Sequence, residues 1–361
     1  MKRIHKKIKS FLKRIRLNLG KLLLDKAPKS KKSLNSLANL RILFIRHDGK
    51  IGDYLVSSFV YQEIKKQAPH AHIGVVAAKE TQSLFSNNPY IDSLYVTKRR
   101  ALLPFWRLGR IIGKAHYDVV IDLTEVLRNR DIVLIRAVKA PINIGYNKAN
   151  FKLFTINVAP NNEHISYDYC QALIYLGYKN INCYSDVPLF YISPALKDFC
   201  QTNLAKDDYI AINFFGAANH KKFSIENQRK WLTRLKTVFP NKKKLILTYP
   251  QVTQQLRSQL PIDEFIMYED TQTIFDSIEL MRNAFLVISP DTAIVHAAAA
   301  LNKPLATFYM SDNPQYPYRK WFPAHIEQQE ITITYYRHNI NEIDPDLVAL
   351  PLTTNLMCSD L

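Results

Sequence analysis

The chain has 361 residues, 47% of them hydrophobic, so it is long enough for two domains and apolar enough to bury a core in each. This composition excludes a chain that is disordered over most of its length. The net charge is +18, and the segment from Met1 to Lys32 holds thirteen Lys or Arg and one acid, Asp25. That segment supplies 13 − 1 = +12 of the excess. The distribution indicates a basic arm on a mildly basic body, and argues against a body that binds nucleic acid over its surface.

The arm carries an amphipathic pattern. Apolar residues recur at steps of three and four from Ile4 to Leu23, with Lys and Arg at many of the positions between them. This period predicts a helix that can lie in the interface of an anionic membrane. Charges interrupt the pattern too often for a signal peptide, and no apolar run of about 20 residues predicts a membrane span.

We therefore expect Met1–Lys32 to contact an anionic membrane surface, and we expect no nucleic-acid partner. A solvated basic tail, or a helix packed on its own protein, are the alternatives. The stretch Ala27–Asn39 (APKSKKSLNSLAN) is typical of a polar linker.

The body begins with short β-rich runs that alternate with helical patterns. A helix is predicted at Tyr54–Gln67. The predicted strands are Arg41–Arg46, His72–Ala78, Ser93–Thr97, Asp118–Leu123 and Ile142–Tyr146. The continuous apolar run DVVIDL indicates a strand covered on both faces, as in parallel sheets.

A second series of the same kind begins near Asp207. A helix is predicted at Asn227–Phe239. The predicted strands are Asp207–Phe214, Lys243–Tyr249, Phe265–Glu269, Phe285–Ser289 and Leu305–Tyr309. Two βαβ series imply an α/β protein with two doubly wound domains. The predicted divisions are 1–39 for the arm and linker, 40–190 and 191–335 for the two domains, and 336–361 for a C-terminal tail.

Three loops that follow strands are candidates for chemistry, because ligands bind outside the carboxyl ends of parallel strands. The first is RHDGKIGD (Arg46–Asp53), where Gly49 and Gly52 permit a tight turn or a close approach to a ligand. Asp53 is either an N-cap or a carboxylate that takes a proton from an incoming hydroxyl. The loop is neither a GxGxxG motif nor a Walker A motif.

The second loop is SPDTAIVHAAAA (Ser289–Ala300), which predicts the start of a helix directly after a strand. Such an N-terminus presents free N–H groups and partial positive charge, which suit a diphosphate. His296 either faces the phosphates or fills the space between helix and sheet. The third loop is FFGAANHKKFS (Phe214–Ser224), in which Lys221 or Lys222 could neutralise a phosphate, or in which both lysines are simply exposed.

The four cysteines form neither a CxxC motif nor a Cys/His cluster. They are Cys170, Cys183, Cys200 and Cys358. Neither a metal site nor a disulfide scaffold is predicted, and this pattern fits a reducing cytoplasm.

Together the three loops resemble the bacterial lipopolysaccharide heptosyltransferases, the ADP-heptose-using glycosyltransferase family 9. RILFIRHDGKIGDYLVSS looks like the family's opening strand, Gly-Asp loop and helix, and ISPDTAIVHAAAALNKP looks like its S-x-D-T-G-x-x-H-x-A-A-A motif. YDVVIDLTEVLRNRD with NIGYNK, and GAANHKKFSIENQRKWL, are similar to two further segments of the family. The resemblance extends roughly from Leu40 to Tyr309.

The resemblance implies a GT-B fold, in which two Rossmann-like domains face each other across a cleft. It implies inverting, metal-independent transfer of a heptose from ADP-heptose to a lipid-linked glycan acceptor in the lipopolysaccharide core. No cofactor or metal is expected, and the enzyme would work in the cytoplasm on the inner face of the inner membrane. Asp53 matches the family's general base, and Lys221 matches its phosphate-binding lysine. The donor-binding residues would be Gly216, Ala217, Lys222, Asp291, Thr292, Ala293 and His296. The acceptor-side loop would contain His47, Gly49, Lys50 and Gly52.

The chain departs from the family pattern at three places. Ala293 replaces the usual Gly, Phe223 stands where the family usually has Trp, and HDGKIGD is more polar than the usual loop. The donor sugar and the acceptor therefore stay open. One alternative is the same fold with another nucleotide sugar or a capsule acceptor, and another is a binding module without catalysis.

Overall fold

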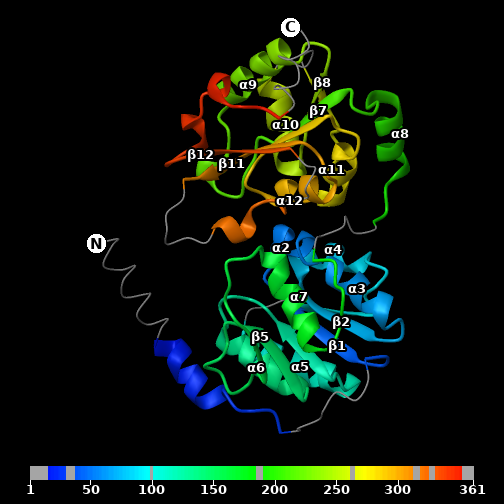
Figure 1. Ribbon diagram of the computed structural model, residues 1–361, viewed down its shortest axis with the longest axis vertical. Helices are drawn as coiled ribbons and strands as arrows, with labels where there is room; N and C mark the ends of the chain where they lie inside the picture. Colours follow the sequence, from blue (N-terminus) through cyan, green and yellow to red (C-terminus); the bar gives the residue numbers. More distant parts are fainter. Residues whose placement is uncertain are drawn as a thin grey trace. The chain divides into compact units, whose positions relative to one another are not determined.

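The computed structural model describes residues 15–29, 37–97, 101–183, 190–260, 265–311, 318–324 and 330–351. The chain divides into two compact units (Figure 1). Unit 1 comprises Met1–Lys50 and Ser57–Cys183, and unit 2 comprises Ile51–Val56 and Tyr184–Leu361.

Unit 1 is built on a parallel six-stranded sheet with the order β3-β2-β1-β4-β5-β6. The strands are β1 (Arg41–Arg46), β2 (His72–Ala78), β3 (Ser93–Thr97), β4 (Val119–Asp122), β5 (Ile142–Tyr146) and β6 (Ile156–Val158). The helices are α3 (Phe59–Gln67), α4 (Gln82–Ser86), α5 (Leu102–Ile112), α6 (Asn129–Val138) and α7 (Ile165–Tyr175). Helices α5 and α6 cover one face of the sheet, and α3 and α7 cover the other (Figure 1). This double cover explains why every residue of β4 is buried.

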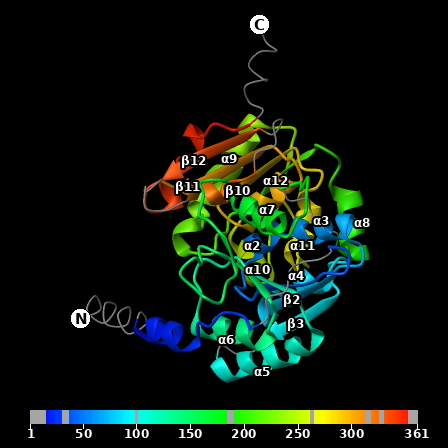
Figure 2. The ribbon, with the colours of Figure 1, turned by 60° about the horizontal axis from the view of Figure 1, so that its bottom comes forward.

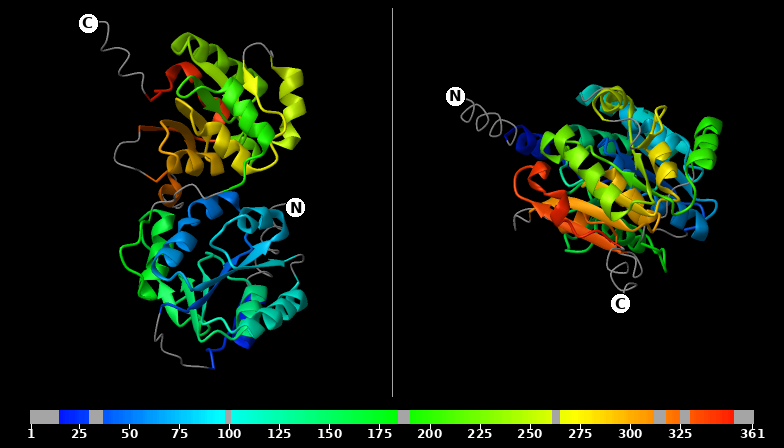
Figure 3. Two further views of the ribbon diagram at one scale, coloured as in Figure 1. Left: turned by 90° about the vertical axis from the view of Figure 1, so that its right-hand side faces the viewer. Right: turned by 90° about the horizontal axis from the view of Figure 1, so that it is seen from above.

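Unit 2 contains a second parallel six-stranded sheet, with the order β12-β11-β10-β7-β8-β9. The strands are β7 (Tyr209–Ile212), β8 (Lys243–Ile246), β9 (Ile266–Met267), β10 (Leu286–Pro290), β11 (Leu305–Met310) and β12 (Ile331–Tyr336). The helices are α2 (Ile51–Leu55), α8 (Pro194–Asn203), α9 (Ile225–Val238), α10 (Pro250–Gln259), α11 (Ile274–Met281) and α12 (Ala293–Ala300). Strands β11 and β12, orange to red, stay side by side when the molecule is turned (Figure 3).

The two sheets have the same strand order when the strands are counted along the chain. In each, the chain builds three strands outward in one direction and then returns to continue on the other side of the first strand. The order therefore reverses between β1 and β4 in unit 1, and between β7 and β10 in unit 2. Ligands bind at such switch points, beyond the carboxyl ends of the strands. The three candidate loops follow β1, β7 and β10, so the topology places each of them at a switch point.

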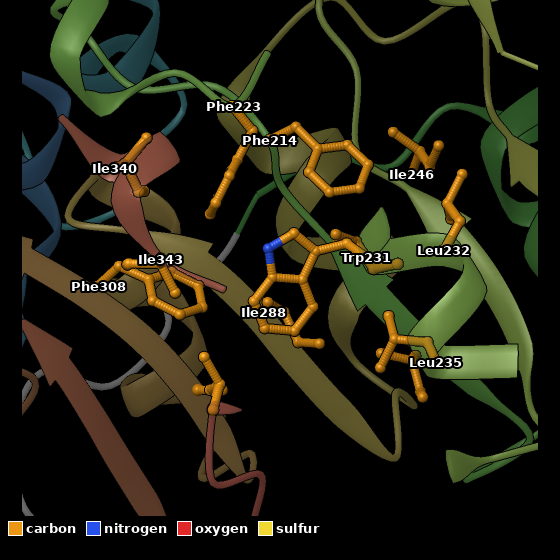
Figure 4. Close-up of a cluster of buried hydrophobic side chains, with 14 of the residues drawn as sticks. Phe214, Phe223, Trp231, Leu232, Leu235, Ile246, Ile288, Phe308, Ile340 and Ile343 are labelled. Atoms are coloured by element: carbon orange, nitrogen blue, oxygen red, sulfur yellow. The ribbon is translucent and has the colours of Figure 1, made fainter. Parts of the chain in front are cut away.

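Each unit has its own hydrophobic core. In unit 2, four aromatic side chains meet between the sheet and α9: Phe214, Phe223, Trp231 and Phe308 (Figure 4). Their ring centroids lie 5.4–6.2 Å apart, and several pairs are edge to face. Such pairs stabilise a core beyond the area that they bury. Phe223, which stands where the resembled family usually has Trp, is thus part of the packing under the loop after β7.

All the predicted strands are present, although β9 and several others are shorter than expected. The sequence did not predict β6 or β12. The single helix predicted at Tyr54–Gln67 is wrong, because the chain turns at residues 56–58 and forms α2 and α3 instead. The buried hydroxyl of Ser57 accepts a hydrogen bond of 2.5 Å from the Arg46 guanidinium.

The segment predicted as a C-terminal tail is part of unit 2 over its described residues. Strand β12 pairs with β11 as far as Tyr336, at the start of that segment. Beyond it, Ile340, Ile343 and Leu350 are buried in the core of unit 2. The prediction failed because this stretch has no helical or strand period; it packs through short 3-10 turns.

The basic arm lies only partly within the described residues. Residues 15–24 are helical, and the earlier residues of the predicted helix lie outside the described part. This helix packs on unit 1: the Asp25 carboxylate accepts hydrogen bonds from the backbone N–H groups of Lys152 (2.9 Å) and Leu153 (2.8 Å). A side chain at Gly20 would overlap the side chain of Asn129. The described part of the arm is therefore a helix packed on its own protein along one side. No helix in the described ranges is both long and apolar enough to cross a membrane.

Two cysteines are paired, which their spacing did not predict. Cys170 and Cys183 form a disulfide in unit 1, whereas Cys200 is a free thiol. Because disulfides are rare in a reducing cytosol, the cysteines do not support the expected compartment.

Candidate functional site

The switch point of unit 2 is held together by a side-chain network. The buried Asn213, directly after β7, donates from Nδ2 to Ser289 Oγ (3.0 Å) and Thr292 Oγ1 (3.2 Å). Its Oδ1 accepts from the backbone N–H of Phe215 (3.0 Å). Asn213 thus joins the ends of two adjacent strands to Thr292, the residue before α12. Sequence reasoning missed Asn213, because only the pairing of β7 with β10 brings it beside residues far along the chain.

Helix α12 begins at this network. Thr292 is its N-cap, and its side chain accepts a hydrogen bond from the backbone N–H of Ile294 (3.3 Å). Residues 297–299 are alanines and are buried, which lets the helix lie close to the sheet. The Asp291–Ala293 segment is half-buried, so the positive end of the helix is accessible. The helix start expected after the strand predicted at Phe285–Ser289 is therefore present.

The loop after β7 brings a lysine to the same place. The Lys221 ammonium forms an ion pair with the Asp291 carboxylate. Gly216 makes this possible, because a side chain there would overlap the Cβ and the carbonyl oxygen of Lys221. Ala217 is exposed beside it. The backbone oxygen of the next residue, Lys222, accepts a hydrogen bond of 3.0 Å from Asn341.

Asn341 was not predicted as part of the site. Besides binding Lys222, its Oδ1 accepts from the backbone N–H of Ser224 (2.7 Å). Its Oδ1 also accepts from Asn227 Nδ2 (3.1 Å). The segment expected to be a tail thus braces the lysine loop, and no local signal in the sequence could have shown this.

Asp53 lies on α2, which packs against α12 within unit 2. Its neighbour Gly52 faces His296: a Cβ added at Gly52 would lie 3.3 Å from His296 Cδ2. Asp53 itself is half-buried. His296 is buried, with its ring 6.2 Å from that of Trp321, so it fills the interior rather than lying open at the helix start.

The remaining loop residues belong to unit 1. Gly49 has a φ of 74°, which only glycine adopts easily, and Lys50 is exposed. The side chain of His47 is 5% exposed, and its Nε2 lies 3.1 Å from Asp131 Oδ1. His47 therefore anchors the loop to α6 instead of presenting its ring to a ligand.

Two buried ionisable side chains lie at or just after the ends of neighbouring strands of unit 1. Burial, together with the charge of Asp131, raises the pKa of Asp122 at the end of β4. Burial lowers the pKa of Lys148, whose ammonium donates to the carbonyl oxygens of Thr124 (2.7 Å) and Tyr146 (2.8 Å). Sequence reasoning named neither Asp122 nor Lys148.

Unit 2 thus collects Gly216, Lys221, Asp291 and Thr292 at one switch point, with α2 against the same helix. A cation beside a helix N-terminus is suited to bind a phosphorylated ligand. In the parts of the chain that the structure describes, no group of three or more His, Cys, Asp or Glu side chains could hold a metal ion.

Comparison with known proteins gives related sequences and folds. The model of glycosyltransferase family 9 (heptosyltransferase) matches residues 272–334, which include α12 and its preceding strand. The Escherichia coli (strain K12) protein that bears the name lipopolysaccharide heptosyltransferase 4 is 24% identical over 359 residues, covering 96% of this chain and 95% of its own length. Lipopolysaccharide heptosyltransferase 1 of Campylobacter coli is 23% identical and covers 75% of this chain and 84% of its own length.

Solved structures share the fold. The glycosyl transferase family 9 protein of Veillonella parvula DSM 2008 has a TM-score of 0.68 at 17% identity, covering 91% of this chain and 98% of its own. Escherichia coli ADP-heptose heptosyltransferase II has a TM-score of 0.62 at 16% identity, covering 88% of this chain and 98% of its own. Escherichia coli WaaC, solved with ADP, has a TM-score of 0.60 at 12% identity, covering 89% and 100%. These likenesses confirm the expected α/β, GT-B class. With the family model over part of unit 2 and the nearly full-length relative, they support glycosyltransferase family 9, the heptosyltransferases, as the family that this chain is similar to.

Proposed function

We propose that this enzyme transfers a heptose from ADP-heptose to the core of lipopolysaccharide, with inversion at the anomeric carbon and without a metal ion. The observation that carries the proposal is the Lys221–Asp291 pair at the start of α12, with α2, the helix that contains Asp53, packed on α12. Relatives named for heptosyl transfer, and the ADP in the WaaC structure, support this donor.

The reaction follows from these groups. An acceptor hydroxyl attacks the anomeric carbon of the heptose, and the bond from that carbon to the diphosphate oxygen breaks. Asp53 takes the proton from the hydroxyl, so the acceptor oxygen forms its new bond without accumulating positive charge. The electron pair of the broken bond stays on ADP, whose diphosphate is stabilised by Lys221 and by the N-terminus of α12.

Asp291 positions the lysine in this scheme. Its carboxylate holds the ammonium of Lys221 at the mouth of α12, and Gly216 gives the loop the room to reach it. A preorganised cation loses little conformational entropy when the diphosphate arrives. The Ala293 side chain adds a methyl group at the first turn of the helix, where the family pattern has Gly, so Ala293 is placed to influence which sugar is accepted.

The enzyme works at the inner face of the inner membrane, where the lipid-linked acceptor is presented. The basic arm Met1–Lys32 supports this location, since its Lys and Arg side chains are attracted to anionic lipid.

The test is transfer from ADP-heptose to heptose-deficient lipopolysaccharide in EDTA, comparing the wild type with Asp53→Ala and Asp53→Asn. Asp48→Asn, which alters a carboxylate in the same loop, is the matched control. We expect both Asp53 variants to lose about 10²–10⁴-fold in turnover while ADP binding is retained, and the control to stay near the wild type.

Other outcomes separate the parts of the proposal. Activity lost in EDTA and restored by magnesium contradicts metal independence. Asp53 variants with wild-type turnover remove this residue from the chemistry. A folded wild type that transfers only from UDP- or GDP-sugars shows that the donor is not ADP-heptose.

A further inference from the structure

Helix α5 presents apolar side chains to solvent. Its buried side consists of Phe105, Gly109 and Ile112. On the rest of the helix, Leu103, Trp106 and Ile111 are 53%, 47% and 60% exposed. A folded core does not require large apolar residues at these positions.

The orientation of α5 is fixed by its glycines. A Cβ added at Gly109 would lie 2.6 Å from both Ala137 Cβ and Leu134 O of α6, and one at Gly113 would lie 2.9 Å from Ala137 O. The two helices therefore approach closely along this line, and α5 cannot turn to bury Leu103 or Ile111 without a clash. Its outward side stays outward in the folded protein.

The charge of the segment is uniformly positive. From Lys98 to Lys114 the sequence contains six Lys or Arg and no Asp or Glu. Within the helix, Arg107 and Arg110 are exposed, and Arg110 lies over the Trp106 ring at 5.9 Å. Leu and Trp combined with Arg on one helix are typical of segments that lie in the interface of an anionic bilayer.

The helix formed by residues 15–24 has the same character on the same side of unit 1. The carbonyl oxygen of Arg16 accepts a hydrogen bond of 2.9 Å from Asn129, at the start of α6. Leu19, Leu22 and Leu23 of this helix are more than half exposed. Figure 2 shows this helix, in blue, beside α6, with α5 on the other side of α6.

Isolated exposed apolar residues are ordinary, but these are gathered together. Half of the large hydrophobic side chains that are exposed in the described part of the chain lie on α5 and on the helix at residues 15–24. Binding to a nucleic acid would explain the exposed Lys and Arg side chains, but it would not explain the exposed Leu, Ile and Trp side chains. An anionic lipid surface accounts for both.

We propose that α5 is a second membrane-binding element, which inserts Leu103, Trp106 and Ile111 into an anionic phospholipid surface beside the basic arm. The inference rests on the proposed membrane location of the enzyme. With two separate contacts, unit 1 has a defined orientation on the bilayer, which a single contact could not provide.

The experiment measures binding of the full chain to phosphatidylcholine vesicles with and without phosphatidylglycerol, in the absence of donor. Trp106 is retained as a fluorescent reporter in the variant Leu103→Ser/Ile111→Ser. The matched control is Ile174→Ser/Tyr175→Ser on α7, where both side chains are 49% exposed. A third variant, Trp106→Phe, identifies the source of the fluorescence change.

We expect the Leu103→Ser/Ile111→Ser variant to bind anionic vesicles about tenfold or more weakly than the wild type and the α7 control. The tryptophan emission of the wild type should shift to shorter wavelength on binding, and Trp106→Phe should lack this shift. Arg107→Gln/Arg110→Gln should weaken binding roughly fivefold for each charge, with no effect on neutral vesicles.

The proposal is overturned if the wild type binds anionic vesicles and the Leu103→Ser/Ile111→Ser variant binds them equally well, since the arm alone would then be responsible. It is also overturned if the only effect of Leu103→Ser/Ile111→Ser is to dissociate a dimer of this chain. The same holds if its only effect is to abolish binding of duplex DNA. A wild type that binds no vesicles contradicts both this inference and the proposed location. In every case, transfer to a lipid-free acceptor saccharide tests the reaction separately, because the α5 variants should leave it unchanged.

Discussion

Lys221 and Lys222 are adjacent in the sequence, but the structure shows different contacts for the two residues. Lys221 pairs with Asp291 at the start of α12, whereas the contact of Lys222 with Asn341 is through its backbone oxygen. We expect Lys221→Met to lower kcat/KM about a hundredfold or more, because one cation is removed from the leaving diphosphate. Lys222→Met should change it by no more than about threefold. Steady-state kinetics with both variants, checked against their melting temperatures, distinguish the two lysines; equal losses would contradict the assignment.

Asp122 supplies a prediction about pH. Burial and the charge of Asp131 raise its pKa above the ordinary 3.8, so the folded protein binds more protons than the unfolded chain between these two pKa values. The contribution of Asp122 to stability therefore falls as the pH rises through that window. Asp122→Asn removes this loss and keeps an oxygen that can accept from Thr124, as Oδ1 does at 2.7 Å.

The measurement for Asp122 is urea unfolding of the wild type and Asp122→Asn over a pH series from acid to neutral. As the pH rises, the free energy of unfolding of Asp122→Asn should increase relative to that of the wild type. Lys148 and Asp131 are the charged groups facing this carboxylate, so Lys148→Met should enlarge the difference. A constant gap between wild type and variant would show that the carboxylate keeps its ordinary pKa.

Single residues could be predicted where a motif surrounds them. Asp291 and Thr292 stand in a strand-to-helix signal that can be read locally, and Lys221 was one of two candidates. Asn213 and Asn341 could not be predicted, because their partners lie 76 and 114 or more positions away and only the fold brings them together. The contact of His47 with Asp131 could not be predicted for the same reason, since Asp131 lies on a helix far along the chain.

At the scale of elements, the pairing of α5 with α6 depends on the absence of a side chain at Gly109. We expect Gly109→Val to destabilise the protein by about 1–3 kcal/mol, because the added atoms would overlap Ala137 and Leu134. Arg107→Val places the same β-branched residue on the exposed side of the helix and should cost well under about 1 kcal/mol. Urea unfolding measures both. Equal costs would mean that close packing at Gly109 does not decide the effect.

The order of the elements was predictable because each strand is a short apolar run between helical patterns. The ends of the elements were less predictable: β7 and β8 end before the predicted runs do, and a turn at residues 56–58 divides a predicted helix in two. Strand β12 was missed although ITITYY is a run of β-branched and aromatic residues with the alternation of a strand. Its partner β11 supplies the hydrogen bonds that make it a strand.

At the scale of the whole molecule, the repetition of one strand order explains why the candidate loops coincide with switch points. The two βαβ series in the sequence predicted two sheets, and the sheets then dictate where strand ends meet. What the sequence could not predict is which unit a short segment joins. Residues 51–56 follow a strand of unit 1, but they belong with unit 2 because α2 packs on α12.

The separate cores of the two units predict how ADP should affect the protein. Because the proposed diphosphate site lies where β7, β10 and α12 meet, ADP should stabilise unit 2 alone. At a hundred times its Kd it should contribute about 2.7 kcal/mol, which slows the exchange of amides that open with unit 2 by about a hundredfold. Hydrogen exchange with mass spectrometry should show this protection in β7, β10 and α12, and none in β1, β2 and β4. Lys221→Met at the same ADP concentration is the control and should lose most of the protection. Equal protection of both sheets would mean that the units unfold as one cooperative body, and protection of unit 1 alone would place the nucleotide elsewhere.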